Sequence, residues 1–409
     1  LTCNLGIHVS EANSFTIYAQ STGENKGHLI ANSTSTTAIE SKAGIGGNDR
    51  ESNGPITING GKIDANAIET TVNLWGSGIG SGHLANSSNI TINGGEITAN
   101  SQTGAGIGSG GIGGNESGTT LASNITINGG EITATSQYGA SIGGGQGGNA
   151  DNITIKGGKI NVTSSGIGAG IGSGGSATTT TTTLASNITI SGGKITVTSE
   201  WGAGIGGGQY GNASDITING GEITANSQSG AGIGSGCTDK NDLLASNITI
   251  KGGTITATSK YGAGIGGGQG GSVDGITITG DEITVTSEWG AGIGGGYRGI
   301  AENITITSGE ITATSTYAGA GIGGGAAGSA SNITIKDGTI TATAFGGAGI
   351  GGGYAGTGNN ITIIGGKVTA TSTATCEDDI IDYTVGAGIG DGGDIEGDSS
   401  TGFYTELEG

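Results

Sequence analysis

The sequence of 409 residues has one proline, no methionine and only 4% aromatic residues. Basic residues are also scarce. The chain has 13 Lys and Arg but 33 Asp and Glu, which gives a net charge of -20. Binding to nucleic acid or to an anionic membrane surface calls for clustered Lys and Arg, so this composition argues against both. No stretch approaches the roughly 18 apolar residues that a membrane-spanning helix needs. We therefore expect neither a nucleic-acid partner nor a membrane span.

The chain has only three cysteines, Cys3, Cys237 and Cys376, and they lie far apart. They form no CxxC pair and no spacing typical of metal ligands, and an odd number gives no complete disulfide framework. Collagen is excluded, since glycine does not occupy every third position and proline is almost absent. We expect no cofactor and no metal centre in the repeated part of the chain.

What the chain has in abundance is glycine, 96 residues of it, inside a repeat. The phrase Asn-Ile-Thr-Ile-x-Gly-Gly-x-Ile-Thr-Ala, clearest from residue 124, recurs eleven times and is followed by a Gly-Ala-x-Ile-Gly-Gly-Gly segment. The commonest spacing is 28 residues, and insertions between the glycine run and the next copy lengthen some repeats. Each copy holds three stretches of period 2, which predict strands with Ile, Val and Ala on one face.

Three short strands cannot bury their apolar face alone, but coils stacked about 4.8 Å apart enclose a common core. The sequence therefore predicts an all-β parallel β-solenoid of about 12 coils, forming one elongated rod. We expect the repeat solenoid over residues 43–375, an N-terminal degenerate coil or cap over 1–42, and an acidic C-terminal cap or last coil over 376–409. Within that last segment, residues 376–382 with Asp391, Asp394 and Asp398 are a candidate calcium site, although capping the open end is the simpler role.

The repeated phrase resembles the Gly-rich repeat regions of large secreted bacterial surface proteins. Those regions are grouped with the pectin-lyase-like parallel β-helices and are often described as carbohydrate-binding. The resemblance spans nearly the whole chain. It implies a right-handed β-helix and an extracellular or cell-surface location, but it does not assign an activity.

Stacked coils turn each repeat position into a column, and one column is aromatic. It consists of Tyr138, Trp201, Tyr261, Trp289, Tyr317 and Phe345. Exposed rings in a row are a candidate glycan-binding surface. The alternative is that the rings stack on one another and cover the corner of the coil.

A second column consists of Thr-x-Thr pairs in the second strand of each coil. The clearest are Thr256 and Thr258, Thr284 and Thr286, Thr312 and Thr314, and Thr341 and Thr343. This face resembles the Thr-x-Thr face of insect ice-binding solenoids. The alternative is that Thr suits a solvated strand face.

Asparagine begins most repeats, and each copy reads Asn-Ile-Thr. The members are Asn89, Asn124, Asn152, Asn187, Asn247, Asn303, Asn332 and Asn360, with Asp215 in one place. We interpret the column as a hydrogen-bonded ladder along the stacking direction. N-glycosylation is the rival interpretation, but we expect these residues to be buried at a corner, where they would be poor acceptors.

The third stretch of each repeat predicts an unusual face, with Ala and Ile inward and only glycine outward. Gly207, Gly267 and Gly295 represent it. Such a face predicts lateral self-association of the rods, and the rod ends are the other candidate contact. The alternative is that glycine is needed for bends.

Catalysis is not expected, because the chain has only two arginines and three histidines, and the histidines all lie in the irregular N-terminal part. No convergent set of carboxylates with Arg, Lys or His is apparent. The sequence thus favours a non-catalytic extracellular structural or adhesive rod, such as a filament or surface-stalk subunit. The alternatives are a glycan-binding module that uses the aromatic column, with polysaccharide as partner, and an ice-binding protein.

Overall fold

A computed structural model of the chain describes residues 1–18, 27–34, 41–67, 75–112, 116, 118–176, 178–179, 181–374 and 386–393, together with the backbone of 405–408. Every regular element in these residues is a β-strand. None of these residues belongs to a helix that is long and apolar enough to cross a membrane. The chain divides into two compact units, Leu1–Gly211 and Asn212–Gly409.

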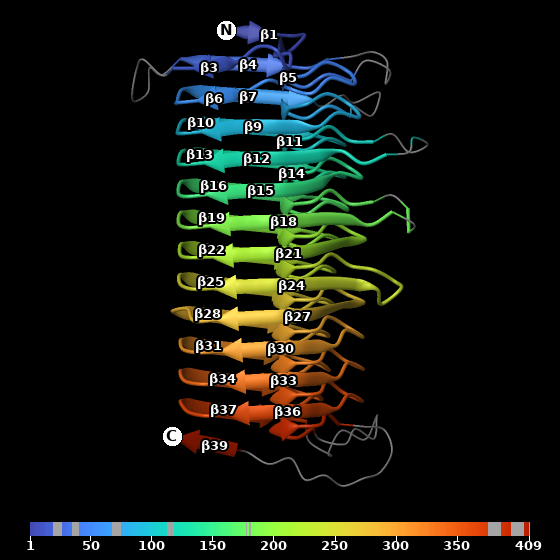
Figure 1. The fold of residues 1–409 in the computed structure, drawn as a ribbon, viewed down its shortest axis with the longest axis vertical. Helices are drawn as coiled ribbons and strands as arrows, with labels where there is room; N and C mark the ends of the chain where they lie inside the picture. The colour runs from blue at the N-terminus through green and yellow to red at the C-terminus, as the bar shows by residue number, and fades with distance from the viewer. Residues whose placement is uncertain are drawn as a thin grey trace. The chain divides into compact units, whose positions relative to one another are not determined.

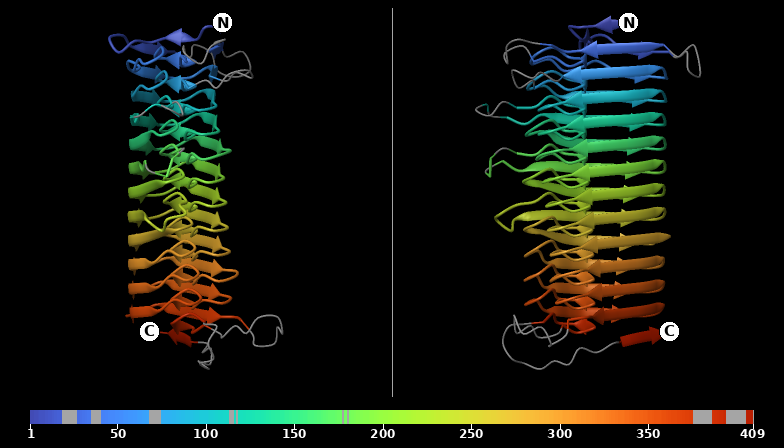
Figure 2. Two further views of the ribbon diagram at one scale, coloured as in Figure 1. Left: turned by 90° about the vertical axis from the view of Figure 1, so that its right-hand side faces the viewer. Right: turned by 180° about the vertical axis from the view of Figure 1, so that it is seen from behind.

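In each unit, every coil contributes one strand to each of three sheets (Figure 1). We number the sheets by the stretch of the repeat that forms them, so that sheet 1 holds Ile-Thr-Ile, sheet 2 holds Ile-Thr-Ala or Ile-Thr-Val, and sheet 3 holds Ile-Gly. The tight turns from sheet 1 to sheet 2 lie on one side of the coils, and the longer loops lie on the other (Figure 2). The expected parallel β-solenoid is confirmed.

The first unit builds each sheet from every third strand of the chain. Sheet 1 consists of β3 (Phe15–Ile17), β6 (Ile56–Ile58), β9 (Ser87–Ile92), β12 (Leu121–Ile127), β15 (Asn149–Ile155) and β18 (Thr183–Ile190). Sheet 2 consists of β1 (Thr2–Cys3), β4 (His28–Asn32), β7 (Lys62–Ala67), β10 (Glu96–Ser101), β13 (Glu131–Ser136), β16 (Lys159–Ser164) and β19 (Lys194–Ser199). Sheet 3 consists of β2 (Ile7–His8), β5 (Ile45–Gly46), β8 (Ile79–Gly80), β11 (Ile107–Gly108), β14 (Ile142–Gly143), β17 (Ile171–Gly172) and β20 (Ile205–Gly206).

The second unit repeats this order. Its sheet 1 consists of β21 (Gly211–Ile218), β24 (Leu243–Ile250), β27 (Gly271–Ile278), β30 (Ala301–Ile306), β33 (Ala330–Ile335) and β36 (Gly358–Ile363). Sheet 2 consists of β22 (Glu222–Ser227), β25 (Thr254–Ser259), β28 (Glu282–Ser287), β31 (Glu310–Ser315), β34 (Thr339–Ala344), β37 (Lys367–Ser372) and β39 (Thr405–Glu408). Sheet 3 consists of β23 (Ile233–Gly234), β26 (Ile265–Gly266), β29 (Ile293–Gly294), β32 (Ile322–Gly323), β35 (Ile350–Gly351) and β38 (Ile389–Gly390). The pairing of β39 with β37 is antiparallel, whereas the other pairs within the units are parallel.

The core of each unit is a set of isoleucine columns. Parallel pairing places identical residues over one another, as Ile125 over Ile153 in sheet 1 and Ile132 over Ile160 in sheet 2. These side chains are completely buried. Burying one such side chain stabilises the fold by about 1.5–3 kcal/mol, so the columns account for the regular spacing of the repeat.

The glycine run of sheet 3 is buried, so the expected open glycine surface is wrong. Gly207, Gly267 and Gly295 are all buried. A Cβ on Gly267 would lie 2.0 Å from the carbonyl oxygen of Gly271, the first residue of β27, which comes directly after the turn that follows sheet 3. That turn folds back over the run, and the N–H of Gly271 donates a hydrogen bond to the carbonyl of Gly268 (2.7 Å). Glycine is required here for close backbone approach, and we do not propose lateral association through this face.

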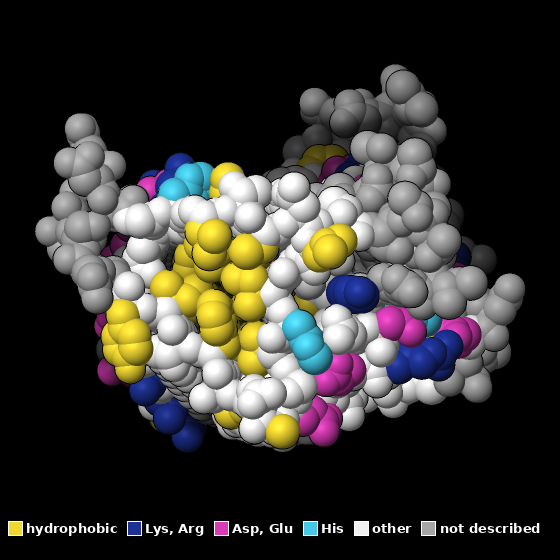
Figure 3. Space-filling model, turned by 90° about the horizontal axis from the view of Figure 1, so that it is seen from above, with side chains coloured by type: hydrophobic (Ala, Val, Ile, Leu, Met, Phe, Trp, Pro, Cys, Tyr) yellow, Lys and Arg dark blue, Asp and Glu magenta, His cyan; other side chains and the backbone are white. Residues whose placement is uncertain are grey.

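The N-terminal end of the first unit exposes apolar side chains, which gather near the centre of the view in Figure 3. A hollow of about 540 Å³ there is lined in part by Phe15, Ile17, Leu29 and Ile63. The interior column of sheet 1 thus reaches the surface at this end in the part of the chain that the structure describes.

Candidate functional site

The aromatic column lies directly after the strands of sheet 2, as predicted. In the first unit Tyr138 follows β13 and Trp201 follows β19. In the second unit Tyr261, Trp289, Tyr317 and Phe345 follow β25, β28, β31 and β34 in turn. Trp201 is 42% exposed, and the other rings are partly exposed.

A second row of side chains lies beside this column, and the sequence analysis missed it. It comes from the turn after sheet 3, whose N–H groups donate hydrogen bonds to the carbonyls of the column. The N–H of Tyr297 donates to Tyr261 (2.8 Å), and the N–H of Ala326 donates to Trp289 (2.9 Å). The repeat did contain a signal, because Gln or Tyr interrupts the glycine run at this position in several coils.

Trp289, Tyr297 and Tyr317 form one group of contacting rings in the second unit. Together with the neighbouring Tyr261 and Arg298 they make up a surface that we call the aromatic edge. The rings of Trp289 and Tyr317 have centroids 4.3 Å apart at an interplanar angle of 53°. Trp289 also meets Tyr297 edge-on, at 5.7 Å and 80°. Such contacts stabilise the corner, so the structural interpretation of the column holds for these rings.

Polar groups surround the same rings. The Trp289 Nε1–H donates to Glu288 Oε1 (3.1 Å). The Arg298 Cζ lies 5.1 Å from the centroid of Tyr297, and the Lys260 Nζ lies 5.2 Å from that of Tyr261. Both distances suit cation–π attraction. Partly exposed ring faces flanked by hydrogen-bonding groups can receive a sugar ring and its hydroxyls.

The threonine pairs are in register, as predicted. In the second unit Thr256, Thr284 and Thr312 pair directly across sheet 2, and Thr258, Thr286 and Thr314 do the same. Thr341 and Thr343 continue both columns in β34. A charged column runs along the same face, where Glu282 is paired with Glu310. Ice binding stays a prediction.

The asparagine ladder is confirmed between some coils, but the expected burial is wrong. Asn152 Nδ2 donates to Asn124 Oδ1 (2.6 Å), and Asn360 Nδ2 donates to Asn332 Oδ1 (2.6 Å). Asn187 and Asn303 donate instead to Asp151 and Asp274. The Asn side chains of the column are nevertheless exposed. Their φ angles are 52° to 58°, in the left-handed region that Asn tolerates better than most residues. Backbone conformation therefore explains the column.

A convergent charged cluster in the first unit was not predicted. His83 Nδ1 lies 3.1 Å from Asp49 Oδ1, and its Nε2 lies 2.8 Å from Glu116 Oε2. Arg50 Nη2 donates to Glu116 Oε1 at 2.6 Å. Desolvation alone would raise the pKa of Glu116, but the hydrogen bond from Arg50 and the charge of His83 outweigh it and lower that pKa. The His83 side chain is only 8% exposed, so the cluster is a closed ion-pair network.

Other charged side chains form pairs along sheet 2 or bind the backbone. Lys159 Nζ donates to Glu131 Oε1 at 2.7 Å, and these two residues are partners in the pairing of β13 with β16. The hydrogen bond to Glu96 raises the pKa of Lys62. Asp391 Oδ1 accepts from the N–H of Gly358 (2.8 Å), while residues 376–382, Asp394 and Asp398 lie outside the described residues. Within those residues, no group of three or more His, Cys, Asp and Glu side chains is placed to hold a metal ion.

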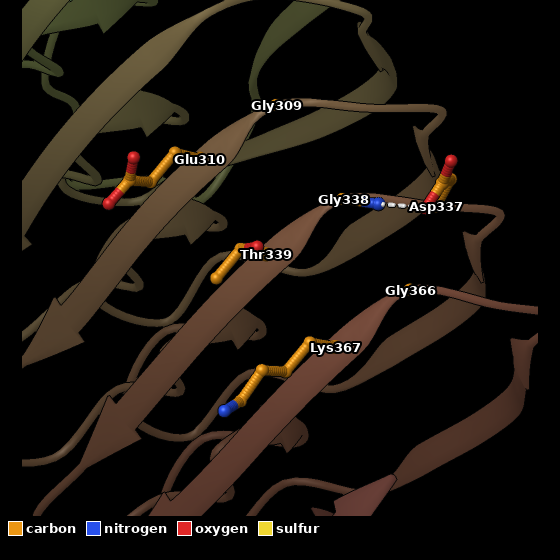
Figure 4. Close-up of a pocket in the computed structure, with 7 residues that line it drawn as sticks. All are labelled: Gly309, Glu310, Asp337, Gly338, Thr339, Gly366 and Lys367. Atoms are coloured by element: carbon orange, nitrogen blue, oxygen red, sulfur yellow. Dashed lines mark hydrogen bonds between the residues drawn. The ribbon is translucent and has the colours of Figure 1, made fainter. Parts of the chain in front are cut away.

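A shallow polar groove of about 580 Å³ lies at the turn from sheet 1 to sheet 2 in the second unit. In Figure 4, Glu310, Thr339 and Lys367 form a row along successive strands, and Asp337 lies beyond the glycine row of Gly309, Gly338 and Gly366. Asp337 Oδ1 accepts from the N–H of Gly338 (2.7 Å). The side chains point along the sheet without converging, so we assign this groove no function.

A family model described as the beta helix repeat matches eleven segments of the chain, which together cover more than half of it. The segments are 56–83, 90–115, 125–146, 153–175, 188–209, 216–237, 248–269, 276–297, 304–326, 333–354 and 361–393. Searches of curated proteins and of solved structures found no match. Each segment begins at the first isoleucine of a repeat, in agreement with the observed coils. The chain therefore belongs to the beta helix repeat family.

Proposed function

We propose that the chain is a non-catalytic β-helix module, located outside the cell, that acts as a structural support and adheres to polysaccharide through its aromatic edge. The observation that carries the proposal is the edge itself. Trp289 is partly exposed between Tyr297 and Tyr317, with Glu288 hydrogen-bonded to its indole nitrogen. Aromatic faces beside a few oriented polar groups are the usual means of holding a sugar chain.

Two further observations favour a structural and binding role over catalysis. The coils repeat nearly identical residues in register, so that the outward Thr positions of sheet 2 in the second unit are columns of one residue type. The convergent charged cluster around His83 is largely closed by its own ion pairs. A reacting group must be able to approach its substrate within hydrogen-bonding reach, which this arrangement does not favour.

The test is binding of the full chain to a panel of insoluble polysaccharides, measured by sedimentation. A variant with Tyr261, Trp289 and Tyr317 replaced by Ala should lose about 10-fold or more in affinity, since each ring contributes about 1 kcal/mol or more to stacking. A matched control variant, in which Thr256, Thr284 and Thr312 of sheet 2 are replaced by Ser, should bind as the wild type does. Equal binding by the two variants, or no binding by the wild type, would contradict the proposal.

A further inference from the structure

Both arginines of the chain occupy the same place in the turn that follows a strand of sheet 3. The N–H of Arg50 donates to His83 on the next coil (2.9 Å), and the N–H of Arg298 donates to Ala326 on the next coil (2.8 Å). Their φ angles are 58° and 65°. This left-handed conformation strains any residue that has a Cβ.

The turn does not require a long side chain at this place. In the coil before Arg298, Gly270 has a φ of 69°, and in the coil after it Ala327 has a φ of 59°. Both make the equivalent backbone hydrogen bond, Gly270 to Tyr297 (2.8 Å) and Ala327 to Tyr354 (2.7 Å). The backbone of the turn therefore does not dictate an arginine at this place.

Arg50 shows what an arginine in this turn can do. Its Nη2 donates to Glu116 Oε1 at 2.6 Å, and its Nε lies 3.7 Å from Asp49 Oδ2. Arg298, by contrast, is exposed and forms no ion pair with any described residue. Its guanidinium lies over the Tyr297 ring. A guanidinium that stacks on a ring keeps its in-plane N–H donors available to an oxyanion.

The local charge is compatible with an anion, although the whole chain carries -20. Lys260 lies over Tyr261 on the same edge, and the nearby Glu288 accepts from the indole of Trp289. At physiological ionic strength, charges more than about 8 Å away are largely screened. Arg298 and the neighbouring Lys260 therefore act on a bound ligand more strongly than the distant carboxylates do.

We infer that Arg298 and Tyr297 form an oxyanion site, and that the ligand of the aromatic edge is an acidic polysaccharide. A ring of the edge stacks on the sugar, while the guanidinium binds its carboxylate or sulfate through paired N–H donors. This inference rests on the proposed function and names the class of glycan.

The experiment uses the full chain and two matched pairs of soluble polymers, without calcium. Alginate is compared with carboxyl-reduced alginate, and dextran sulfate with dextran. We expect at least one acidic polymer to bind about 10-fold tighter than its neutral partner. Arg298→Gly should lose about 10-fold in affinity for that acidic polymer, the loss of one charge-assisted hydrogen bond, and should bind the neutral one unchanged.

Ala327→Gly is the matched control, because it makes the same backbone change one coil away. It should bind as the wild type does, and both glycine variants should keep Tm within about 2 °C. Arg298→Lys keeps the charge without the paired donors and should show a smaller loss. The acidic polymer preferred tells whether carboxylate or sulfate is recognised.

Equal binding of the acidic and neutral partners by the wild type overturns the inference, even if Arg298→Gly fails to fold. So does an Arg298→Gly protein that binds like the wild type. In either case the proposed function stands if the aromatic variant has lost binding. Absence of binding to any polymer, soluble or insoluble, overturns both.

Discussion

At the scale of the residue, backbone conformation explains the asparagine column better than solvent exposure or modification does. From the second repeat onwards the position holds Asn, Asp215 or Gly275, and each has a positive φ. These are the residue types that tolerate the left-handed region. The sequence contained this signal, but the ladder alone did not reveal that the side chains are exposed. That depends on the path of the backbone within the strands of sheet 1, which residue identity does not set.

Replacing Asn332 by Ala should lower the free energy of unfolding by about 2 kcal/mol. Ala is strained in the left-handed region by about 1 kcal/mol, and the hydrogen bonds to Asn303 (3.1 Å) and from Asn360 (2.6 Å) are lost. Asn332→Gly relieves the strain and should cost about half as much. Urea denaturation measures both values. Equal destabilisation by Ala and Gly would show that backbone strain is not the cause.

The thiol of Cys237 should resist alkylation in the folded protein. The side chain is only 4% exposed, and burial raises its pKa from 9.0 to about 12. The folded state therefore holds a proton that the unfolded state has lost between these two values, and stability falls as pH rises through that window. Mass spectrometry after iodoacetamide treatment at pH 8.5 should find Cys3 modified and Cys237 unmodified until urea is added. Comparable labelling of the two thiols would contradict the burial.

At the scale of the element, the strands, their register and the apolar columns could all be predicted from the repeat. Period 2 fixes which residues face inward, and identical coils can only match when like residues pair. The covering of the glycine run could not be predicted in the same way. The repeat was interpreted as leaving Gly267 on an open surface, but the turn after β26 buries it, and that contact is tertiary. The row beside the aromatic column was missed for the same reason.

Gly267→Ala should therefore be strongly destabilising, by about 3 kcal/mol. The added Cβ would lie 2.0 Å from a backbone oxygen, which cannot move without displacing the next coil. Gly27→Ala is the control, because no atom lies within 4 Å of the Cβ it adds. Thermal unfolding followed by circular dichroism compares the two. A Gly267→Ala protein as stable as the control would mean that the turn does not close over the run.

At the scale of the whole molecule, insertions explain why the His83 cluster was not foreseen. Asp49, His83 and Glu116 come from three successive coils whose loops differ in length. No fixed spacing in the sequence marks such a set, whereas the regular columns follow directly from the repeat. The family match likewise begins at residue 56, after the irregular coils that supply Asp49 and Arg50.

The acidic composition predicts how solubility should depend on pH. The sequence pI is about 4.2, and self-repulsion from the charge of -20 at pH 7 keeps copies apart. Lowering the pH towards 4.2 should promote association, which light scattering measures. The effect should reverse when the pH is restored. A scattering signal that stays constant from pH 7 to pH 4.5 would show that net charge does not control association.

The matched edges between coils have a consequence for how such a chain evolves. The two edges of each inner coil carry the same hydrogen-bonding pattern and the same apolar side chains. The pairing of β28 with β25 on one side and with β31 on the other shows this. Duplication or loss of one 28-residue segment in a gene leaves a junction as well fitted as the original. Unequal recombination can therefore change the number of coils without redesigning the interior, so coil number is the property that selection can adjust most freely.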